Sequence, residues 1–135
     1  MKLSKATKYK IVQFLIDEFN PTFIYLFGSF AKGEGRNDSD IDLAIYTENI
    51  IDPYTLLMSA SSLAFEVKRE VQIVHLKDIS TVFTAQVVGT KEVLYCNDEY
   101  KMANFDILAF KKYTRLNEER QIILGAFDED GNIYG

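Results

Sequence analysis

The sequence predicts an α+β protein, in which a small mixed β-sheet is covered by helices. Three observations predict this fold class. Short runs rich in β-branched and aromatic residues alternate with segments whose apolar residues recur every three or four positions. Their order along the chain is helix, strand, strand, helix, strand, helix, strand, helix. The chain has 135 residues, of which 47% are hydrophobic, so residues 1–135 suit a single domain with one core.

The first half of the chain contains two predicted helices and two predicted strands. Residues 4–19 have helical spacing, with Ser4 as the expected N-cap and Asn20-Pro21 as the stop. The segments 22–28 and 40–46 are apolar and rich in β-branched and aromatic residues, so each predicts a strand. Asp52-Pro53 is typical of a helix start. The apolar stripe that follows consists of Leu56, Leu57, Ala60, Leu63, Ala64 and Val67.

The second half of the chain alternates strands and helices. Residues 70–76 alternate between apolar and polar and predict a third strand, and residues 78–89 predict a short helix. A fourth, peripheral strand is expected at 92–96. From Asp98 onward, apolar residues at helical spacing predict one long C-terminal helix over about 98–124, followed by a flexible tail at 125–135.

Composition excludes several classes of protein. The net charge is −5, which argues against a DNA-binding protein, because such proteins carry an excess of Lys and Arg over the phosphates. No apolar run approaches the roughly 20 residues that a membrane-spanning helix needs, so no membrane partner is expected. The single cysteine, Cys96, excludes an internal disulfide and suits a reducing cytoplasm, which is the expected location.

The stretch from Gly28 to Asp42 carries the chemistry. Asp40 and Asp42 lie two residues apart in a strand and therefore share one face of the sheet. If the first two strands are antiparallel, Gly28-Ser29 lies beside these aspartates. A divalent cation relieves the repulsion between two carboxylates, and Mg²⁺ accepts such ligands together with substrate phosphates. Glycine allows backbone N–H groups to approach a phosphate. The pattern indicates a metal-dependent phosphoryl or nucleotidyl transfer site.

The polar segments of the chain also admit simpler interpretations. Glycine, serine, asparagine and aspartate are common in ordinary loops, but the spacing between two apolar strands favours a functional site. Gly33 and Gly35 suggest a phosphate-binding loop, but the segment contains no G-K-[ST] and is therefore not a Walker phosphate loop. The tail "DEDGNIYG" does not supply the ligand positions of a calcium loop.

Gly28-Ser29, ten further residues and Asp40-Ile41-Asp42 resemble the G-S-x10-D-x-D signature of the DNA polymerase β-like nucleotidyltransferase superfamily. At this length, the chain is similar to the minimal nucleotidyltransferase (MNT) antitoxins encoded beside HEPN-domain toxins. The resemblance implies a polymerase β-like fold and an enzyme that transfers AMP from ATP onto a tyrosine of its cognate HEPN toxin. The transfer silences the RNase activity of the toxin, and the two proteins are expected to form a hetero-oligomer.

The resemblance also implies a role for each residue that matches the signature. Gly28 and Ser29 would hold the triphosphate, with Ser29, Asp40 and Asp42 as the catalytic residues. Asp40 and Asp42 would bind Mg²⁺, and two Mg²⁺ ions are expected when the nucleotide is bound. The remaining nucleotide-binding candidates are Arg36, Lys32 and Ser39.

One position departs from the pattern of this superfamily. The next strand usually carries a third carboxylate, and the aligned residue here is Gln72, whose amide is neither a base nor a good magnesium ligand. Three alternatives follow: Glu70, two residues earlier, substitutes for it; water or a group on the partner takes the proton; or catalysis is weak or absent. In the last case the protein would neutralise its partner by binding alone. An antibiotic nucleotidyltransferase is the third functional alternative, although 135 residues leave little room for a drug-binding region.

Overall fold

The computed structural model describes residues 1–130, and these residues contain four strands and four helices in the predicted order. The α+β fold class is therefore confirmed. The elements are α1 (Lys5–Phe19), β1 (Phe23–Phe27), β2 (Ile41–Tyr46), α2 (Pro53–Val67), β3 (Val71–His75), α3 (Thr81–Thr90), β4 (Glu92–Cys96) and α4 (Glu99–Asp130).

The four strands form one mixed sheet in the order β3-β2-β1-β4. β1 pairs antiparallel with both β2 and β4, whereas β2 and β3 are parallel and are joined by the crossover helix α2. The two central strands are the most apolar, and all five residues of β1 are buried. β4 lies at an edge of the sheet, as its predicted peripheral position requires.

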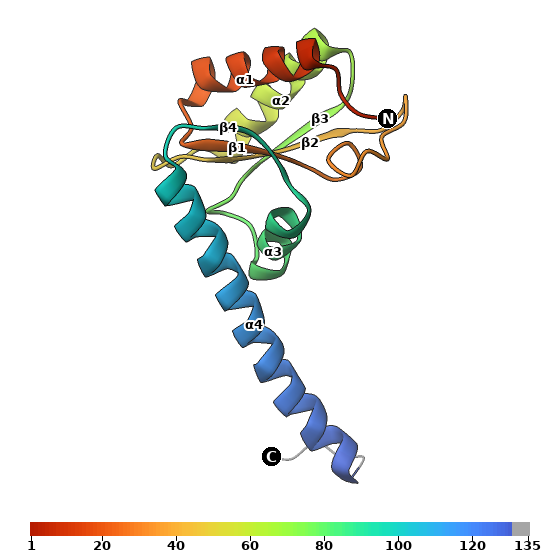
Figure 1. Ribbon diagram of the computed structural model, residues 1–135, viewed down its shortest axis with the longest axis vertical. Coiled ribbons are helices and arrows are strands. Elements are labelled where there is room, and N and C mark those ends of the chain that lie inside the picture. The colour runs from red at the N-terminus through yellow and green to blue at the C-terminus, as the bar shows by residue number, and fades with distance from the viewer. Residues whose placement is uncertain (131–135) are drawn as a thin grey trace.

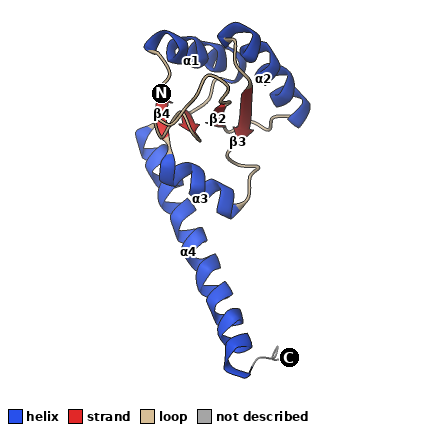
Figure 2. Ribbon diagram, turned by 90° about the vertical axis from the view of Figure 1, so that its right-hand side faces the viewer, coloured by secondary structure: helices blue, strands red, loops and turns tan. Residues whose placement is uncertain are grey.

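Helices cover both faces of the sheet (Figures 1 and 2). α1 and α2 lie over one face, and α3 and α4 lie on the other. Because side chains alternate along a strand, each central strand supplies both layers of the core. Ile24 and Leu43 pack toward α1 and α2, whereas Tyr25 and Ala44 pack toward α3 and α4. We call the second side the α3/α4 face.

The helices begin where capping side chains predict. The Ser4 hydroxyl accepts a hydrogen bond from the Thr7 N–H, and Asp52 accepts one from Tyr54. α3 begins at Thr81, later than the predicted residue 78, because Ser80 caps it by accepting from the Phe83 N–H. In the stripe predicted for α2, Leu57 is 64% exposed, since the helix is wider than its contact with the sheet and α1.

α4 extends well past α3 and the sheet (Figure 1). It begins after Asp98, whose carboxylate accepts from the Lys101 N–H, and it ends at Asp130. The predicted end at about residue 124 was wrong, because residues 125–130 are helical rather than a tail. A lone Gly125 costs a helix only about 1 kcal/mol relative to alanine, and no proline follows to stop it. The rest of the predicted tail, 131–135, lies outside the described residues.

None of the helices within residues 1–130 combines the length and apolar character needed to cross a lipid bilayer.

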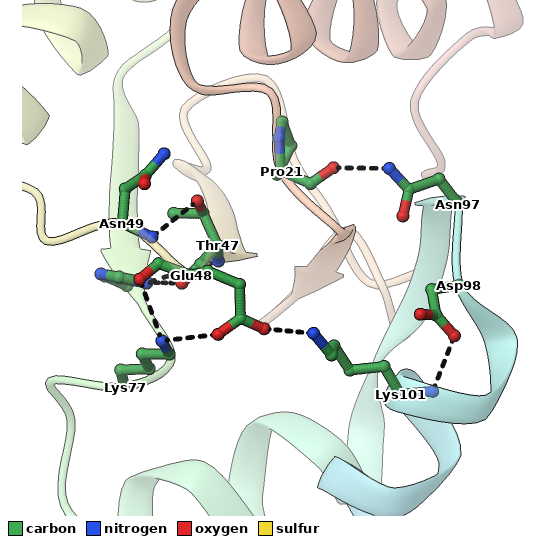
Figure 3. A network of polar contacts seen from close by, with 9 residues as sticks. Pro21, Thr47, Glu48, Asn49, Lys77, Asn97, Asp98 and Lys101 are labelled. Atoms are coloured by element: carbon green, nitrogen blue, oxygen red, sulfur yellow. Dashed lines mark hydrogen bonds and ion pairs between the residues drawn. The ribbon is translucent and has the colours of Figure 1, made fainter.

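Glu48 joins three elements at the end of the sheet remote from Asp42 (Figure 3). Its carboxylate accepts from the Lys77 ammonium, which follows β3, and from the Lys101 ammonium in α4. These hydrogen bonds, the one from Lys101 first, lower the pKa of Glu48. Since the network is exposed to water, it orients the start of α4 more than it stabilises the fold.

A half-buried polar network also fixes α4 to the sheet. The Tyr25 hydroxyl, in β1, donates to Asp106 of α4 over 2.6 Å, and the Lys91 ammonium pairs with the same carboxylate. The ammonium also lies 4.3 Å from the centre of the Tyr25 ring. Burial, and then the bond to Asp106, raise the pKa of the Tyr25 hydroxyl, so it remains a donor at all physiological pH values. The central strand, the end of α3 and α4 therefore meet at one carboxylate.

Removing that carboxylate should destabilise the protein. Asp106→Ala leaves the buried tyrosine hydroxyl and the Lys91 ammonium without their shared acceptor, and we expect a loss of roughly 2–4 kcal/mol in the free energy of unfolding. Urea denaturation measures it. As a control, Glu119→Ala breaks the exposed pair of α4 with Arg115, whose atoms lie 3.6 Å apart, and should cost less than about 1 kcal/mol. Equal losses in the two variants would contradict the anchoring role of Asp106.

Candidate active site

The pairing of β1 with β2 creates the site. In this antiparallel register Phe27, the last residue of β1, lies opposite Asp42, the second residue of β2. The chain segment that leaves β1 at Gly28 therefore starts beside the carboxylate, which confirms the juxtaposition expected from the sequence. Asp42 has the same strand parity as Ala44 and Tyr46, so it lies on the α3/α4 face.

Gly28 is in direct contact with Asp42. A methyl group built onto Gly28 would lie 2.3 Å from the Asp42 Oδ2 atom, closer than any real contact of a side chain. The backbone of Gly28 also has a φ of +74°, in the left-handed region that other residues adopt only with strain. Both constraints require glycine here, because the backbone at position 28 passes directly beside the Asp42 carboxylate.

The loop after Gly28 turns immediately. The Lys32 N–H donates to the Gly28 carbonyl at 3.3 Å, and the Glu34 N–H donates to the Ser29 carbonyl at 2.9 Å. Residues 29–33 therefore form a hydrogen-bonded turn. Ser29 is half-buried at the start of the turn, next to Gly28, whereas the Lys32 side chain is exposed. The loop therefore places Ser29 next to the residue that contacts Asp42, and it leaves Lys32 exposed to solvent.

The second half of the loop closes on itself. The Arg36 N–H donates to the Ser39 hydroxyl at 2.8 Å, and the Ser39 N–H donates back to the Arg36 carbonyl at 3.1 Å. Ser39 therefore shapes the approach to Asp40, whatever contact it makes with a nucleotide. The Arg36 side chain is exposed and extends from this turn into solvent.

The two aspartates repel each other in the protein. Burial, and secondly the charge of Asp40, raise the pKa of the Asp42 carboxyl above its ordinary value. Asp42 is half-buried, whereas Asp40 is exposed just before β2. A divalent cation between them would relieve this repulsion, and two carboxylates with phosphate oxygens form the ligand set that Mg²⁺ takes with nucleotides. The residues present fit such an ion.

The strand position at which the superfamily usually carries a third carboxylate holds the amide of Gln72. Gln72 pairs with Asp42 in the parallel register of β2 and β3, so it occupies the strand position beside the aspartates. Glu70 lies just before β3 and is exposed. Within residues 1–130, no three His, Cys, Asp or Glu side chains come close enough together to hold a metal ion. Glu70 therefore does not complete a carboxylate triad, and the first of the three alternatives raised by the sequence is not supported.

Two residues that shape the loop were missed by sequence reasoning. Phe30 is 1% exposed although it lies in a polar loop, and Arg69, after α2, contacts that loop. A single aromatic residue within a run of polar ones is the signal that indicates a buried anchor. Arg69 has no such signal, because an arginine between a helix and a strand is ordinary.

Comparison with known proteins agrees with this geometry. Residues 9–100 match the family model described as "Polymerase beta, Nucleotidyltransferase". The chain belongs to this family. The resemblance inferred from the Gly-Ser and Asp-x-Asp motif is thereby confirmed. Among curated proteins of the family, the protein adenylyltransferase MntA of Shewanella oneidensis is 30% identical over 123 residues, which cover 90% of this chain and 88% of the relative.

Solved structures extend the family relationship to the fold. A toxin–antitoxin crystal structure with AMP-PNP contains a chain that is 31% identical, with a TM-score of 0.80 over 87% of this chain and 95% of that one. An MNT antitoxin in complex with the tri-AMPylated HEPN toxin of Shewanella oneidensis is 28% identical, with a TM-score of 0.78 over 91% and 97% of the two chains. The polymerase β-like fold, including the long C-terminal helix, is confirmed.

The contact between Gly28 and Asp42 predicts the effect of a small substitution. Gly28→Ala strains the backbone and displaces the carboxylate, so we expect nucleotide affinity to fall at least about tenfold and stability to fall by roughly 1–3 kcal/mol. Gly33→Ala is the matched control, because Gly33 has nearly the same φ of +76° but faces only the flexible Lys2 side chain at 3.5 Å. Calorimetric titration and thermal unfolding of both variants measure the difference. Equal loss of nucleotide affinity in the two variants would refute the role of the contact.

The raised pKa of Asp42 predicts that replacing this carboxylate with an amide stabilises the folded protein. The native state binds this proton more tightly than the unfolded state, so stability falls as pH rises from the ordinary aspartate pKa through the raised one. Asp42→Asn removes this penalty, and in a chelator near neutral pH its Tm should exceed that of the wild type. The difference should vanish at pH values below the ordinary pKa. An unchanged Tm near neutral pH would contradict the repulsion between the aspartates.

Proposed function

We propose that this protein is an antitoxin nucleotidyltransferase. It transfers AMP from ATP, in a magnesium-dependent reaction, onto a tyrosine of a HEPN-family RNase toxin encoded beside it, and so neutralises that toxin. It acts in the cytoplasm as a hetero-oligomer with the toxin. Similarity along nearly the whole chain to an MNT antitoxin solved with an AMPylated HEPN toxin supports this function.

One observation carries the proposal from the fold to the chemistry. Gly28, which opens the loop, touches the carboxylate of Asp42, and Asp40 lies close enough to raise the pKa of that carboxylate. A loop that accepts phosphates and a pair of carboxylates that accepts a cation therefore share one end of β2. A triphosphate needs both, because its own charge must be neutralised while its α-phosphorus is held in line with the acceptor.

Each residue of the site has a proposed role. Asp40 and Asp42 would hold Mg²⁺, which neutralises the phosphate charge when bound. Gly28 and Ser29 would hold the triphosphate through the turn at 29–33, and Arg36 and Lys32 would pair with its outer oxygens from the rim. The acceptor oxygen attacks the α-phosphorus, the bond from phosphorus to the bridging oxygen breaks, and pyrophosphate leaves. The product is a tyrosine-linked AMP.

The amide at position 72 favours a tyrosine as the acceptor. Gln72 cannot accept the proton that the acceptor loses, and Glu70 does not join the aspartates. A phenol, with a pKa of about 10, releases its proton to water or to a group on the toxin far more readily than an alcohol does. A site with only two carboxylates is therefore better matched to a tyrosine than to a sugar hydroxyl.

The same amide supports a second candidate function. If Gln72 leaves the site too weak to catalyse transfer, the protein would neutralise the toxin by binding and covering it. The two functions differ in one measurable respect, because only the enzymatic one depends on the charges of Asp40 and Asp42.

The test uses the purified protein, the neighbouring toxin, Mg²⁺ and ATP labelled in its α-phosphate. We expect label on the toxin with the wild type, and a loss of at least about 10²-fold with the double variant Asp40→Asn/Asp42→Asn. Asp38→Asn is the matched control, since this exposed aspartate lies in the same loop outside the site and should leave labelling unchanged.

Two outcomes would contradict the enzymatic function. An unlabelled toxin with folded wild-type protein rejects transfer, and a double variant that still protects cells from the toxin then establishes neutralisation by binding. Full labelling by the double variant would instead reject Asp40 and Asp42 as the metal ligands.

A further inference from the structure

Arg69 lies at the junction between α2 and β3. α2 ends at Val67 and is capped by Lys68, which adopts the left-handed conformation with a φ of 58°, and β3 begins at Val71. The sharp change of direction at Lys68 turns the next residue, Arg69, toward the loop between β1 and β2. Its side chain is half-buried there.

The Arg69 guanidinium bonds to the backbone of that loop. Its Nη1 atom donates to the Arg36 carbonyl at 3.0 Å and to the Asn37 carbonyl at 2.8 Å. Both acceptors belong to the turn that leads into Asp40. A charged donor forms stronger hydrogen bonds than a neutral one, so these two bonds restrain a segment that otherwise has few contacts.

The same guanidinium stacks on the beginning of the loop. Its central carbon lies 4.9 Å from the centre of the Phe30 ring. Gly35 packs against the same ring, so closely that a methyl group on Gly35 would lie 2.3 Å from its Cδ1 atom. Arg69 therefore links both halves of the loop, through Phe30 near Ser29 and through the carbonyls near Asp40.

The neighbouring residue extends this support into β2. The Glu70 carbonyl accepts from the Ile41 N–H at 2.9 Å, between the two aspartates. The α2–β3 junction thus holds the loop with a side chain and the start of β2 with a carbonyl. β3 is the strand beside β2 at this edge of the sheet. The N-terminal ammonium of Met1 holds the middle of the same loop, by donating to the Gly33 and Gly35 carbonyls at 3.1 and 2.6 Å, whereas Arg69 holds the turn that leads into Asp40.

We propose that Arg69 is a positioning residue for nucleotide binding. It does not touch the nucleotide. It holds the turn at Arg36–Ser39 and the ring of Phe30 in the arrangement that places Ser29 and Arg36 against a triphosphate above Asp40 and Asp42. Lysine is a poor substitute, because its single point charge cannot stack on the ring while donating to two carbonyls. The inference rests on the proposed function, since it assumes that the loop binds ATP.

The test measures nucleotide affinity and loop order separately from turnover. The probe is the Mg²⁺ complex of an ATP analogue with a methylene bridge between its α- and β-phosphorus atoms, titrated calorimetrically without toxin. We expect Arg69→Met to weaken binding about tenfold or more and Arg69→Lys to recover only part of the loss. Arg115→Met removes an exposed arginine of α4 far from the loop and should leave affinity unchanged.

Hydrogen exchange distinguishes positioning from general stability. In Arg69→Met, amide exchange should accelerate in residues 30–39, while the amides of β1 and β2 keep their protection. Wild-type affinity in folded Arg69→Met would overturn the inference, as would loss of affinity with uniform acceleration of exchange across the sheet. Failure of the wild type itself to bind the analogue would overturn the proposed nucleotide site, and this inference with it, so the two failures are distinguishable.

Discussion

The contact between Gly28 and the carboxylate of Asp42 is the constraint on which the rest of the site depends. It exists because β1 and β2 are antiparallel neighbours whose register places Phe27 opposite Asp42. The strands that bear this register are the most deeply buried ones in the sheet, so core packing holds the contact in place. The apolar interior therefore sets the distance between the start of the loop and the Asp42 carboxylate.

The two faces of the sheet differ, because only one of them contains the candidate site. The face under α1 and α2 is filled by aliphatic side chains. The α3/α4 face contains aromatic residues, the anchor of α4 and, at one end, Asp42 and Gln72. Tyr25 and Phe27 alternate on this face along β1, so the strand that positions Asp42 also bears the hydroxyl bonded to Asp106. β1 therefore connects the candidate site, beside Phe27, to α4, through the hydrogen bond from Tyr25.

Most of the fold could be predicted from the sequence, because its local signals agree with one another. Ser4 and Asp52 cap helices as predicted, and the G-S-x10-D-x-D spacing indicated the candidate site. The end of α4 was missed because a single glycine is too weak a stop signal. Arg69 was missed because its contacts are with backbone carbonyls more than thirty positions away in the sequence, and such acceptors have no residue-type signature. Tertiary packing alone supplies that information.

The buried ring of Phe30 gives a physical meaning to the motif's fixed interval of ten residues between Ser29 and Asp40. The chain leaves one central strand, circles an aromatic side chain that is 1% exposed, and returns to the adjacent strand. The ten residues are thus the length of chain needed to pass around the Phe30 side chain, with Gly35 packed against its ring. An insertion in the loop would open a void beside the Phe30 ring, and a deletion would shift Asp40 and Asp42 relative to Gly28. Neither β1 nor β2 can shift to compensate, because each is hydrogen-bonded to a neighbouring strand on both sides. The length of this loop and the aromatic side chain at position 30 therefore constrain each other.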